Sequence, residues 1–327
     1  MTDPLYDKTG GEPELVALEA ALGDFAHRAP LRELPPRRSR RPAPVVAAVI
    51  AAAALAALAV IVVGRRGDPG CQVAGAGFAF AVDGAPARCA GSPAERGTLP
   101  VGAWLETAGA ATADVRIADI GHLTVFGDSR IRLIDTGAAG HRLELARGRI
   151  AARVTAPPRL FVVDTPVASA VDLGCAYELA VEPDGRTRLR VTSGAVSLEA
   201  HGVAAYAPMD TEVLAAPGRG PGTPVALTAS AALRDAVARF DAGDRSAVAA
   251  IVVAAGPGDT ATLWNLLART DGEDRAAVFA RLDALTPVPA DISADAIRAG
   301  DREAIARWRD ALVGRWMCAG CFGKSKR

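Results

Sequence analysis

The chain has 327 residues, which is enough for about two domains and their connections. Lysine plus arginine and aspartate plus glutamate both number 37, so the formal net charge is zero. Proteins dedicated to binding nucleic acid usually carry a basic excess, so this balance argues against a nucleic-acid partner. The five cysteines are too few for a dense disulfide scaffold.

Residues 1–43 contain one stretch with the periodicity of an amphipathic helix. Its apolar side chains, Leu15, Leu18, Leu22 and Phe25, recur at helical spacing and form a stripe that one helix cannot bury alone. We therefore expect these four residues to bind a partner, and a cytoplasmic regulator such as a sigma factor is one candidate. The alternative is a helix that lies on the membrane surface or is weakly ordered. A proline- and arginine-rich linker follows.

Residues 44–64 contain no charged side chain. As a helix with a rise of about 1.5 Å per residue, this segment would extend over about 32 Å, which matches the hydrocarbon core of a bilayer. The sequence therefore predicts a single transmembrane helix. A signal peptide is the alternative, but a long flank precedes the segment and Arg65 and Arg66 follow it. The arginines before it predict a bacterial inner-membrane protein with a cytoplasmic N-terminus and a periplasmic C-terminal bulk.

Residues 98–227, which follow an expected extracytoplasmic linker at 65–97, show the alternation of β-strands. Runs such as His122-Leu-Thr-Val-Phe and Arg130-Ile-Arg-Leu-Ile alternate apolar with polar residues, and turn residues separate them. This pattern predicts an all-β domain, built as a sandwich or as a β-solenoid.

Three segments of this region together resemble the FecR domain. The run Leu160-Phe-Val-Val-Asp-Thr-Pro, continuing to Leu173-Gly-Cys-Ala-Tyr-Glu-Leu, is similar to the family core Phe-x-Val-x-Thr-Pro…Gly-Thr-x-Phe-x-Val. Leu143-Glu-Leu-Ala-Arg-Gly-Arg-Ile resembles the family pattern Leu-x-Leu-x-x-Gly-x-Val. Val191-Thr-Ser-Gly-Ala-Val resembles Val-x-x-Gly-x-Val. The resemblance covers about residues 101–216 and departs from the family at Cys175 and Tyr177.

The resemblance implies a FecR-like transmembrane regulator of the anti-sigma type. Such a protein would carry a signal from a periplasmic or outer-membrane protein, across the lipid bilayer, to a cytoplasmic sigma factor. The head of this chain is shorter than in family members that hold a sigma factor. The alternative function is an extracytoplasmic scaffold that binds protein or glycan and has no sigma-factor partner.

Residues 228–317 change to helical periodicity. Asp244-Arg245, Asp274-Arg275 and Asp301-Arg302 each precede an alanine-rich run and lie near thirty residues apart, which predicts an α-helical repeat-like domain with a protein-binding surface. The alternative is a small helical bundle that caps the β domain, in which the recurring Asp-Arg pairs reflect only shared helix-capping chemistry. Residues 318–327 form a basic tail with a Cys-x-x-Cys pair.

The predicted disulfides are Cys71–Cys89 and Cys318–Cys321, because thiols outside the cytoplasm tend to oxidise. A labile metal site lacking two ligands, or a redox pair, is the alternative for Cys318 and Cys321. The histidines are scattered, and we find no nucleophile motif or phosphate-binding loop, so we expect no catalytic residue, metal or cofactor. Carboxylate pairs such as Asp164 with Asp172 are assigned to solvated strand faces. The predicted fold class is thus multi-domain: a transmembrane helix, an all-β FecR-like domain and a helical repeat-like domain.

Overall fold

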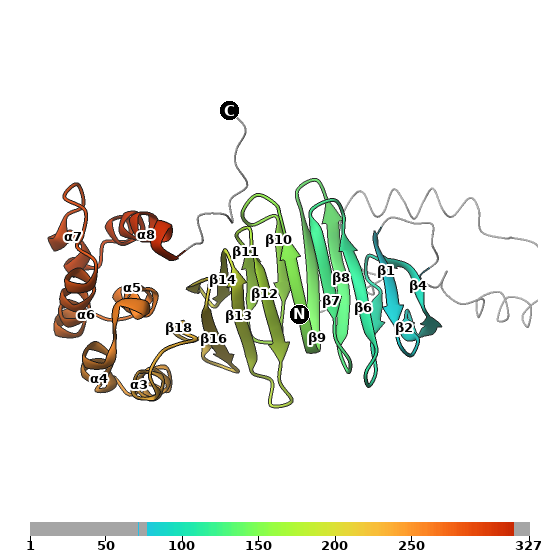
Figure 1. The fold of residues 1–327 in the computed structure, drawn as a ribbon, viewed down its shortest axis with the longest axis horizontal. Helices are drawn as coiled ribbons and strands as arrows, with labels where there is room; N and C mark the ends of the chain where they lie inside the picture. Colours follow the sequence, from blue (N-terminus) through green and yellow to red (C-terminus); the bar gives the residue numbers. More distant parts are fainter. Residues whose placement is uncertain (1–70, 72–76, 317–327) are drawn as a thin grey trace, which may run out of the picture. The chain divides into compact units, whose positions relative to one another are not determined.

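The computed structural model describes residues 71 and 77–316. The chain divides into two compact units, Met1–Arg66 and Gly67–Arg327, and all described residues belong to the second. In the described part, 18 strands come first along the chain and the helices follow (Figure 1).

The strands form two sheets that share one long strand, β9. In the order of their pairing, sheet A contains β4 (Arg96–Pro100), β1 (Gly77–Asp83), β6 (Thr112–Ile117), β7 (Gly121–Val125), β9 (Gly140–Val154), β12 (Ala176–Val181), β13 (Thr187–Ser193) and β16 (Thr211–Ala216), which also pairs with β17 (Gly220–Pro221) and β18 (Val225–Ala226). Sheet B contains β3 (Ser92–Ala94), β2 (Ala87–Cys89), β5 (Trp104–Glu106), β8 (Arg130–Gly137), β9, β10 (Phe161–Asp164), β11 (Ser169–Asp172), β14 (Ala195–Ala200) and β15 (Val203–Pro208).

The hairpins are divided between the two sheets, and β8–β9 is a further hairpin of sheet B. The hairpin β6–β7 lies in sheet A, β10–β11 in sheet B, β12–β13 in sheet A and β14–β15 in sheet B. Figure 1 shows these strands side by side as the chain progresses. Most neighbours are antiparallel, and β9 with β10 is a parallel pair. The observed strands begin at Gly77, within the stretch 65–97 that the sequence predicts as a linker.

Two glycines mark places where the chain passes from one sheet to the other. Strand β9 pairs within sheet B up to Arg147 and within sheet A from Gly148 onward. Gly148 has φ +86°, and a Cβ atom there would lie 2.3 Å from the Ser129 hydroxyl oxygen, so no other residue fits without a shift. Gly194, between β13 and β14, has φ +70°, and a Cβ would lie 2.2 Å from the carbonyl oxygen of Gly174. These are the glycines of the second and third FecR-like segments.

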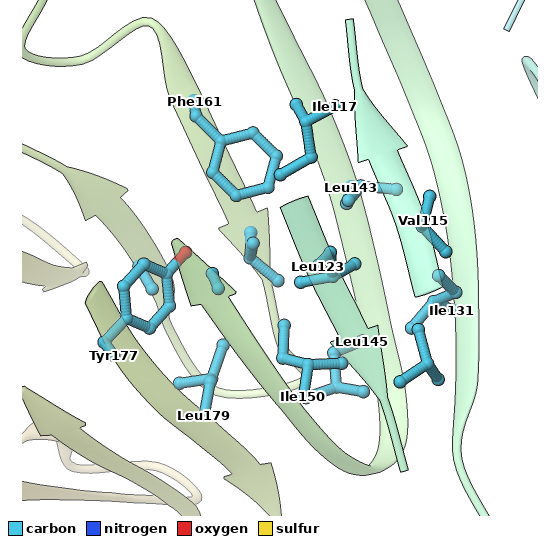
Figure 2. Close-up of a cluster of buried hydrophobic side chains, with 14 of the residues drawn as sticks. Val115, Ile117, Leu123, Ile131, Leu143, Leu145, Ile150, Phe161, Tyr177 and Leu179 are labelled. Carbon is cyan, nitrogen blue, oxygen red and sulfur yellow. The ribbon is translucent and has the colours of Figure 1, made fainter. Parts of the chain in front are cut away.

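The core lies between the inner faces of the two sheets. Alternate residues of strands such as β6 point inward, since Val115 and Ile117 are buried and Asp114 and Arg116 are exposed. Figure 2 shows side chains from both sheets, among them Phe161 and Tyr177, meeting in this layer. Burying each such large apolar side chain contributes about 1.5–3 kcal/mol, so the alternation fixes which face of every strand is inside.

The helices build a second apolar cluster. They are α3 (Ala231–Asp241), α4 (Ala247–Ala254), the 3₁₀ turn η1 (Pro257–Asp259), α5 (Thr260–Leu267), α6 (Gly272–Leu285), α7 (Ala294–Ala299) and α8 (Arg302–Trp316). Their buried residues surround Trp308, which is fully buried, and Val225 of β18 belongs to the same cluster. The helical cluster is therefore continuous with the end of the sheets.

Polar contacts fasten the helices to the strands. The Asn265 side chain of α5 accepts a hydrogen bond from the Tyr206 backbone N–H and donates one to the Tyr206 carbonyl, both at 2.9 Å. It thereby pairs the backbone of β15 as a neighbouring strand would, and it covers part of an edge that would otherwise be open to another chain. The Thr262 hydroxyl donates to the Pro224 carbonyl at 2.7 Å.

The predicted fold class is wrong. The described chain is mainly β-sheet, and no helix among residues 77–316 is long and apolar enough to cross a membrane. The predicted transmembrane segment, residues 44–64, lies outside the described residues. The predicted domain boundaries stay predictions.

The helices also do not form a clear repeat, because the three Asp-Arg pairs play different parts. Asp244 accepts hydrogen bonds from the backbone N–H and hydroxyl of Ser246. Asp274 lies inside the first turn of α6, whose N-cap is Asp271. Asp301 accepts from the backbone N–H of Ala304 at the start of α8. The recurring Asp-Arg pairs therefore reflect a local preference for aspartate near helix starts. The helices that follow the three pairs also differ in length.

Candidate functional site

The outer face of sheet B carries charged side chains that pair across neighbouring strands. Arg132 of β8 pairs with Glu144 of β9, whose Oε2 accepts from Arg132 Nε at 2.9 Å. Arg142 of β9 pairs in the same way with Asp164 of β10. These residues occupy the positions that alternate with the buried ones, so the pleat that buries the leucines of β9 also presents its charges outward.

A shallow groove of about 490 Å³ lies on this face. We call it the arginine groove, and it is lined by Arg142, Arg159, Val162, Ser169, Val171, Glu199, Ala200, His201, Gly202, Val203 and Ala204. Its residues come from β9, the connection before β10, the hairpin β10–β11 and the hairpin β14–β15. The topology therefore brings together segments that lie up to sixty-two residues apart, from Arg142 to Ala204.

Asp164 holds the first of the two arginines. Its Oδ2 accepts from Arg142 Nε at 2.6 Å, and its Oδ1 accepts from Arg142 Nη2 at 2.8 Å. The same Oδ1 accepts from the Ser169 hydroxyl at 2.7 Å, across the β10–β11 hairpin. This two-point contact fixes the plane of the guanidinium, and the Arg142 side chain remains about half exposed.

Glu199 holds the second arginine of the groove, Arg159. Arg159 donates from Nη1 to Oε1 at 3.0 Å and from Nη2 to Oε2 at 3.2 Å, and the Ser197 hydroxyl donates to Oε1 at 2.8 Å. Burial raises the pKa of the Glu199 carboxyl, but the hydrogen bonds from Arg159 and Ser197 outweigh it, so that the pKa lies below its ordinary value. The hydrogen bond and the charge of Glu199 raise the pKa of Arg159. Both groups are charged at neutral pH.

Two residues of the groove have left-handed backbone conformations. Arg159 has φ +72° and His201 has φ +50°. Neither is glycine, and such conformations are uncommon for arginine because its Cβ crowds the backbone. The Arg159 backbone N–H donates to the Asp172 carbonyl at 2.7 Å, so the pairing with β11 holds this residue in place. Backbone strain of this kind is concentrated at functional positions.

A second feature of sheet B is Trp104 of β5, which lies between two arginines of β8. The Arg130 guanidinium carbon is 4.0 Å from the indole ring centroid, and that of Arg132 is 4.7 Å away. Arg130 also pairs with Glu106 at 3.3 Å. Cation–π contacts of this kind fix the ring and use its faces for intramolecular contacts, so we assign Trp104 a structural role.

Behind the groove lies a buried group of ionisable residues. Asp172 is 1% exposed, and its carboxylate accepts from the Gly174 backbone N–H at 2.7 Å and from the Cys175 thiol at 2.6 Å. Burial raises the pKa of Asp172 to about 6, although the two hydrogen bonds lower it. Burial and the Asp172 charge raise the pKa of the Cys175 thiol, and burial raises that of the Tyr177 phenol. The assignment of Asp172 to a solvated strand face is therefore wrong, because the last residue of β11 turns inward.

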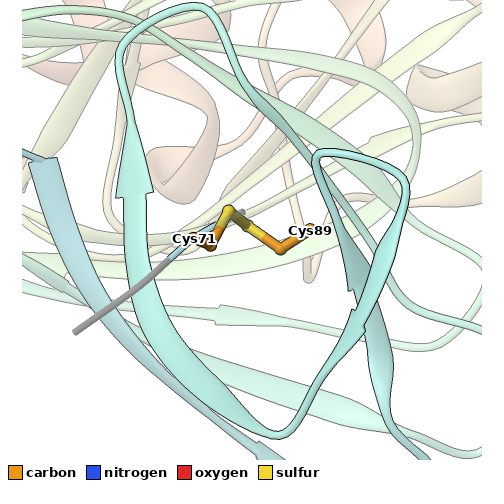
Figure 3. Close-up of a disulfide and its surroundings, with 2 residues drawn as sticks. All are labelled: Cys71 and Cys89. Carbon is orange, nitrogen blue, oxygen red and sulfur yellow. A yellow bond between two sulfur atoms is a disulfide. The ribbon is translucent and has the colours of Figure 1, made fainter. Parts of the chain in front are cut away.

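Of the two predicted disulfides, the structure describes one. Cys71 and Cys89 are joined by a disulfide with a Cα–Cα distance of 5.8 Å (Figure 3). Both are buried, and the bond ties the chain just after residue 70 to strand β2. Cys318 and Cys321 lie outside the described residues, and Cys175 is the free, buried cysteine within them.

The predicted partner-binding residues Leu15, Leu18, Leu22 and Phe25 also lie outside the described residues. Among the residues that are described, no three His, Cys, Asp or Glu side chains come together in a way that suits a metal ion. The sequence analysis did not single out Arg142, Arg159 or Glu199. Arg142 alternates with buried neighbours in β9, whereas Arg159 lies in the connection before β10, and the ion pairs of both arginines depend on strand register.

Comparison with known protein families supports the assignment of this region. Residues 104–197 match the model of the FecR protein family. The chain contains a FecR-family domain. The resemblance seen in the sequence is thereby confirmed, and the matched residues include Arg142, Arg159 and the β10–β11 hairpin, while the β14–β15 hairpin extends beyond them.

Solved structures give a more distant likeness to the FecR-domain protein. Two crystal structures of a protein described as a candidate anti-sigma factor from Parabacteroides distasonis ATCC 8503, at 2.50 and 1.65 Å resolution, each share 16% identity with this chain at a TM-score of 0.32. Each similarity covers 36% of this chain and 56% of that protein, so this chain spans little more than half of its relative. None of the curated proteins compared with the sequence matches it.

Proposed function

We propose that this protein is an envelope signalling regulator of the FecR type. Its β domain receives a signal from a periplasmic or outer-membrane protein, and the N-terminal region passes that signal to a cytoplasmic partner such as a sigma factor. The observation that carries the proposal is the match of residues 104–197 to the FecR protein family. The paired arginines Arg142 and Arg159 of the arginine groove support it, because they offer a surface for a protein partner on the matched domain.

The proposal places the protein at the bacterial inner membrane, with the N-terminus in the cytoplasm and residues 67 onward outside it. The Cys71–Cys89 disulfide supports this location, since disulfides persist mainly in oxidising compartments. The uncharged stretch 44–64, with arginines before it, supports the same orientation.

Signalling would proceed by a shift between two populations of the protein. A ligand on the β domain changes the balance only if it binds one of the two states more tightly. The disulfide joins the sheet to the chain close to residue 66, where the N-terminal unit ends. We propose that a displacement of strand β2 reaches that junction through this disulfide.

The test is affinity co-purification of the full chain from cells, with the bound proteins identified by mass spectrometry. We expect a sigma factor to be retained by the wild type and lost from a Leu18→Asp/Leu22→Asp variant. Ala20→Asp adds a charge on the opposite side of the predicted helix and is the matched control. Retention by all variants, or capture by none while a known anti-sigma pair is retained, would contradict the proposal.

The second candidate function is an extracytoplasmic protein- or glycan-binding scaffold with no sigma-factor partner. The arginine groove favours it, since a binding surface on sheet B needs no cytoplasmic output. The same co-purification separates the two functions: a scaffold would retain envelope components in every variant and no sigma factor in any.

A further inference from the structure

We propose that the arginine groove binds an extended acidic segment of a partner protein, whose carboxylates contact Arg142 and Arg159. This inference deepens the proposed function, on which it rests, by naming the chemistry of the partner that the β domain receives. The argument starts from the hydrogen-bonding capacity of the groove.

The groove has a surplus of donors. A guanidinium offers five N–H donors and a carboxylate accepts about four hydrogen bonds. Asp164 already accepts three, two from Arg142 and one from Ser169. Glu199 also accepts three, two from Arg159 and one from Ser197. Each carboxylate is nearly saturated, whereas each guanidinium keeps three N–H groups without a partner among the described residues. A ligand for this groove must therefore bring acceptors.

The two arginines are held ready for such a ligand. Arg142 and Arg159 each make a two-point contact with a carboxylate, so their side chains are ordered before anything binds. Their side chains remain 49% and 60% exposed, so their free N–H groups are accessible. The left-handed backbone of Arg159 brings this residue to the groove from a connection rather than from a strand.

The floor of the groove favours a peptide over a small anion. Val162 and Val171 lie opposite one another on β10 and β11, between Arg142 of β9 and the Arg159–Glu199 pair at β14. An apolar floor between charged walls suits a segment that alternates acidic with apolar side chains, because successive residues of an extended chain point to opposite sides. The space of about 490 Å³ accommodates several residues in that conformation.

The acids of the groove argue against a uniform polyanion. Asp164 and Glu199 accompany the two arginines, so the formal charge of these four groups is zero. A nucleic acid or a sulfated glycan carries charge at every unit and would bring some of it close to these carboxylates. A peptide can place its carboxylates at the free guanidinium donors and neutral groups elsewhere.

The test measures the binding of two fluorescein-labelled peptides to the full chain in detergent micelles by fluorescence anisotropy at low salt. One heptapeptide alternates aspartate with valine, and its partner alternates asparagine with valine. We expect the aspartate peptide to bind at least about tenfold more tightly, and to weaken as salt increases because exposed charge pairs are screened. Equal binding of both peptides, or binding of neither, would overturn the proposal.

Substitutions of the two groove arginines test whether the peptide binds at the arginine groove. Arg142→Gln and Arg159→Gln are each expected to weaken the aspartate peptide by about five- to twentyfold. Arg186→Gln removes the same charge from a comparably exposed arginine in the β12–β13 hairpin, and should change the affinity less than about twofold. Because Arg159→Gln leaves Glu199 without its arginine, the double variant with Glu199→Gln provides a second comparison with no uncompensated charge.

Two results would refute the assignment. An effect of Arg186→Gln as large as that of the groove variants would show that only net charge matters. Tighter binding of chondroitin sulfate than of the peptide, lost in Arg159→Gln, would assign the groove to a polyanionic glycan. The peptide assay tests groove residues 142–204 and the co-purification tests Leu18 and Leu22, so this inference and the sigma-factor proposal can fail separately.

Discussion

The buried carboxyl of Asp172 makes the stability of the β domain depend on pH. Asp172 lies at the end of β11 with 1% of its surface exposed, and its partners are a backbone N–H and the Cys175 thiol. No cation compensates its charge among these contacts. Replacement by asparagine keeps the shape and one acceptor oxygen for the Gly174 N–H while removing the charge.

The size of the effect follows from the pKa of Asp172. The folded protein raises this pKa from 3.8 to about 6, so the protonated form is favoured by folding. The stabilisation is complete below pH 3.8 and is lost as the pH rises through about 6. The two values correspond to about 3 kcal/mol in total, of which about 2 kcal/mol is lost between about pH 4.5 and 7.5.

Urea unfolding followed by tryptophan fluorescence measures this loss. All four tryptophans, Trp104, Trp264, Trp308 and Trp316, lie in the described part of the chain, so the signal reports on that unit. We expect the free energy of unfolding of the wild type to fall by about 2 kcal/mol more than that of Asp172→Asn between about pH 4.5 and 7.5.

Asp119→Asn, which changes an exposed turn residue, is the control and should follow the wild-type pH dependence. Parallel curves for the wild type and Asp172→Asn would refute the reasoning, because they would mean that Asp172 has the same pKa in the folded and unfolded chains. A steeper loss in the variant would reverse the sign and refute it equally.

Three further changes test how the fold is held together, each by the urea midpoint at fixed pH. Gly148→Ala should destabilise the protein by more than about 3 kcal/mol. Its control is Gly102→Ala, which has φ +85° and no atom within 4 Å of the new Cβ and should cost only about 1–2 kcal/mol. Equal costs would contradict the close contact at Gly148. Asn265→Leu should cost about 1–3 kcal/mol, since the partly buried N–H and carbonyl of Tyr206 lose their partner. A neutral result would show that water replaces the amide. Replacing both Cys71 and Cys89 by serine should cost about 3 kcal/mol for a closed loop of this size, and the reductant that lowers the wild-type midpoint should then have no effect on the variant.

Individual strands could be predicted from the sequence because they depend on local alternation. The runs at His122 and Arg130 lie in β7 and β8, where every second side chain is buried. The FecR-like segments were recognisable for a related reason: their glycines stand where the backbone must turn between two sheets and leaves no room for a Cβ atom. Gly148 and Gly194 are therefore constraints that a sequence pattern can carry.

The helices show where local pattern failed. The aspartate–arginine echo predicted a repeat, but aspartate serves three separate capping or turn functions there, each of which needs only its own few neighbours. Helix lengths and packing partners were decided by the core around Trp308, which gathers residues from across the helical region. Periodicity in sequence indicates similar local chemistry and does not by itself establish repeated packing.

The arginine groove depended wholly on tertiary structure. Sequence alone places Arg142 on the exposed side of a strand, but its pairing with Asp164 requires the parallel register of β9 and β10. Arg159 and Glu199 are forty residues apart and meet only because β11 pairs with β14. The sequence by itself determined which apolar side chains of the strands are buried, since their burial follows from period and hydrophobicity, whereas the burial of the polar Asp172 did not follow from it. Only the tertiary structure decided which charges face one another, because register between distant strands is set by the packing of the whole core.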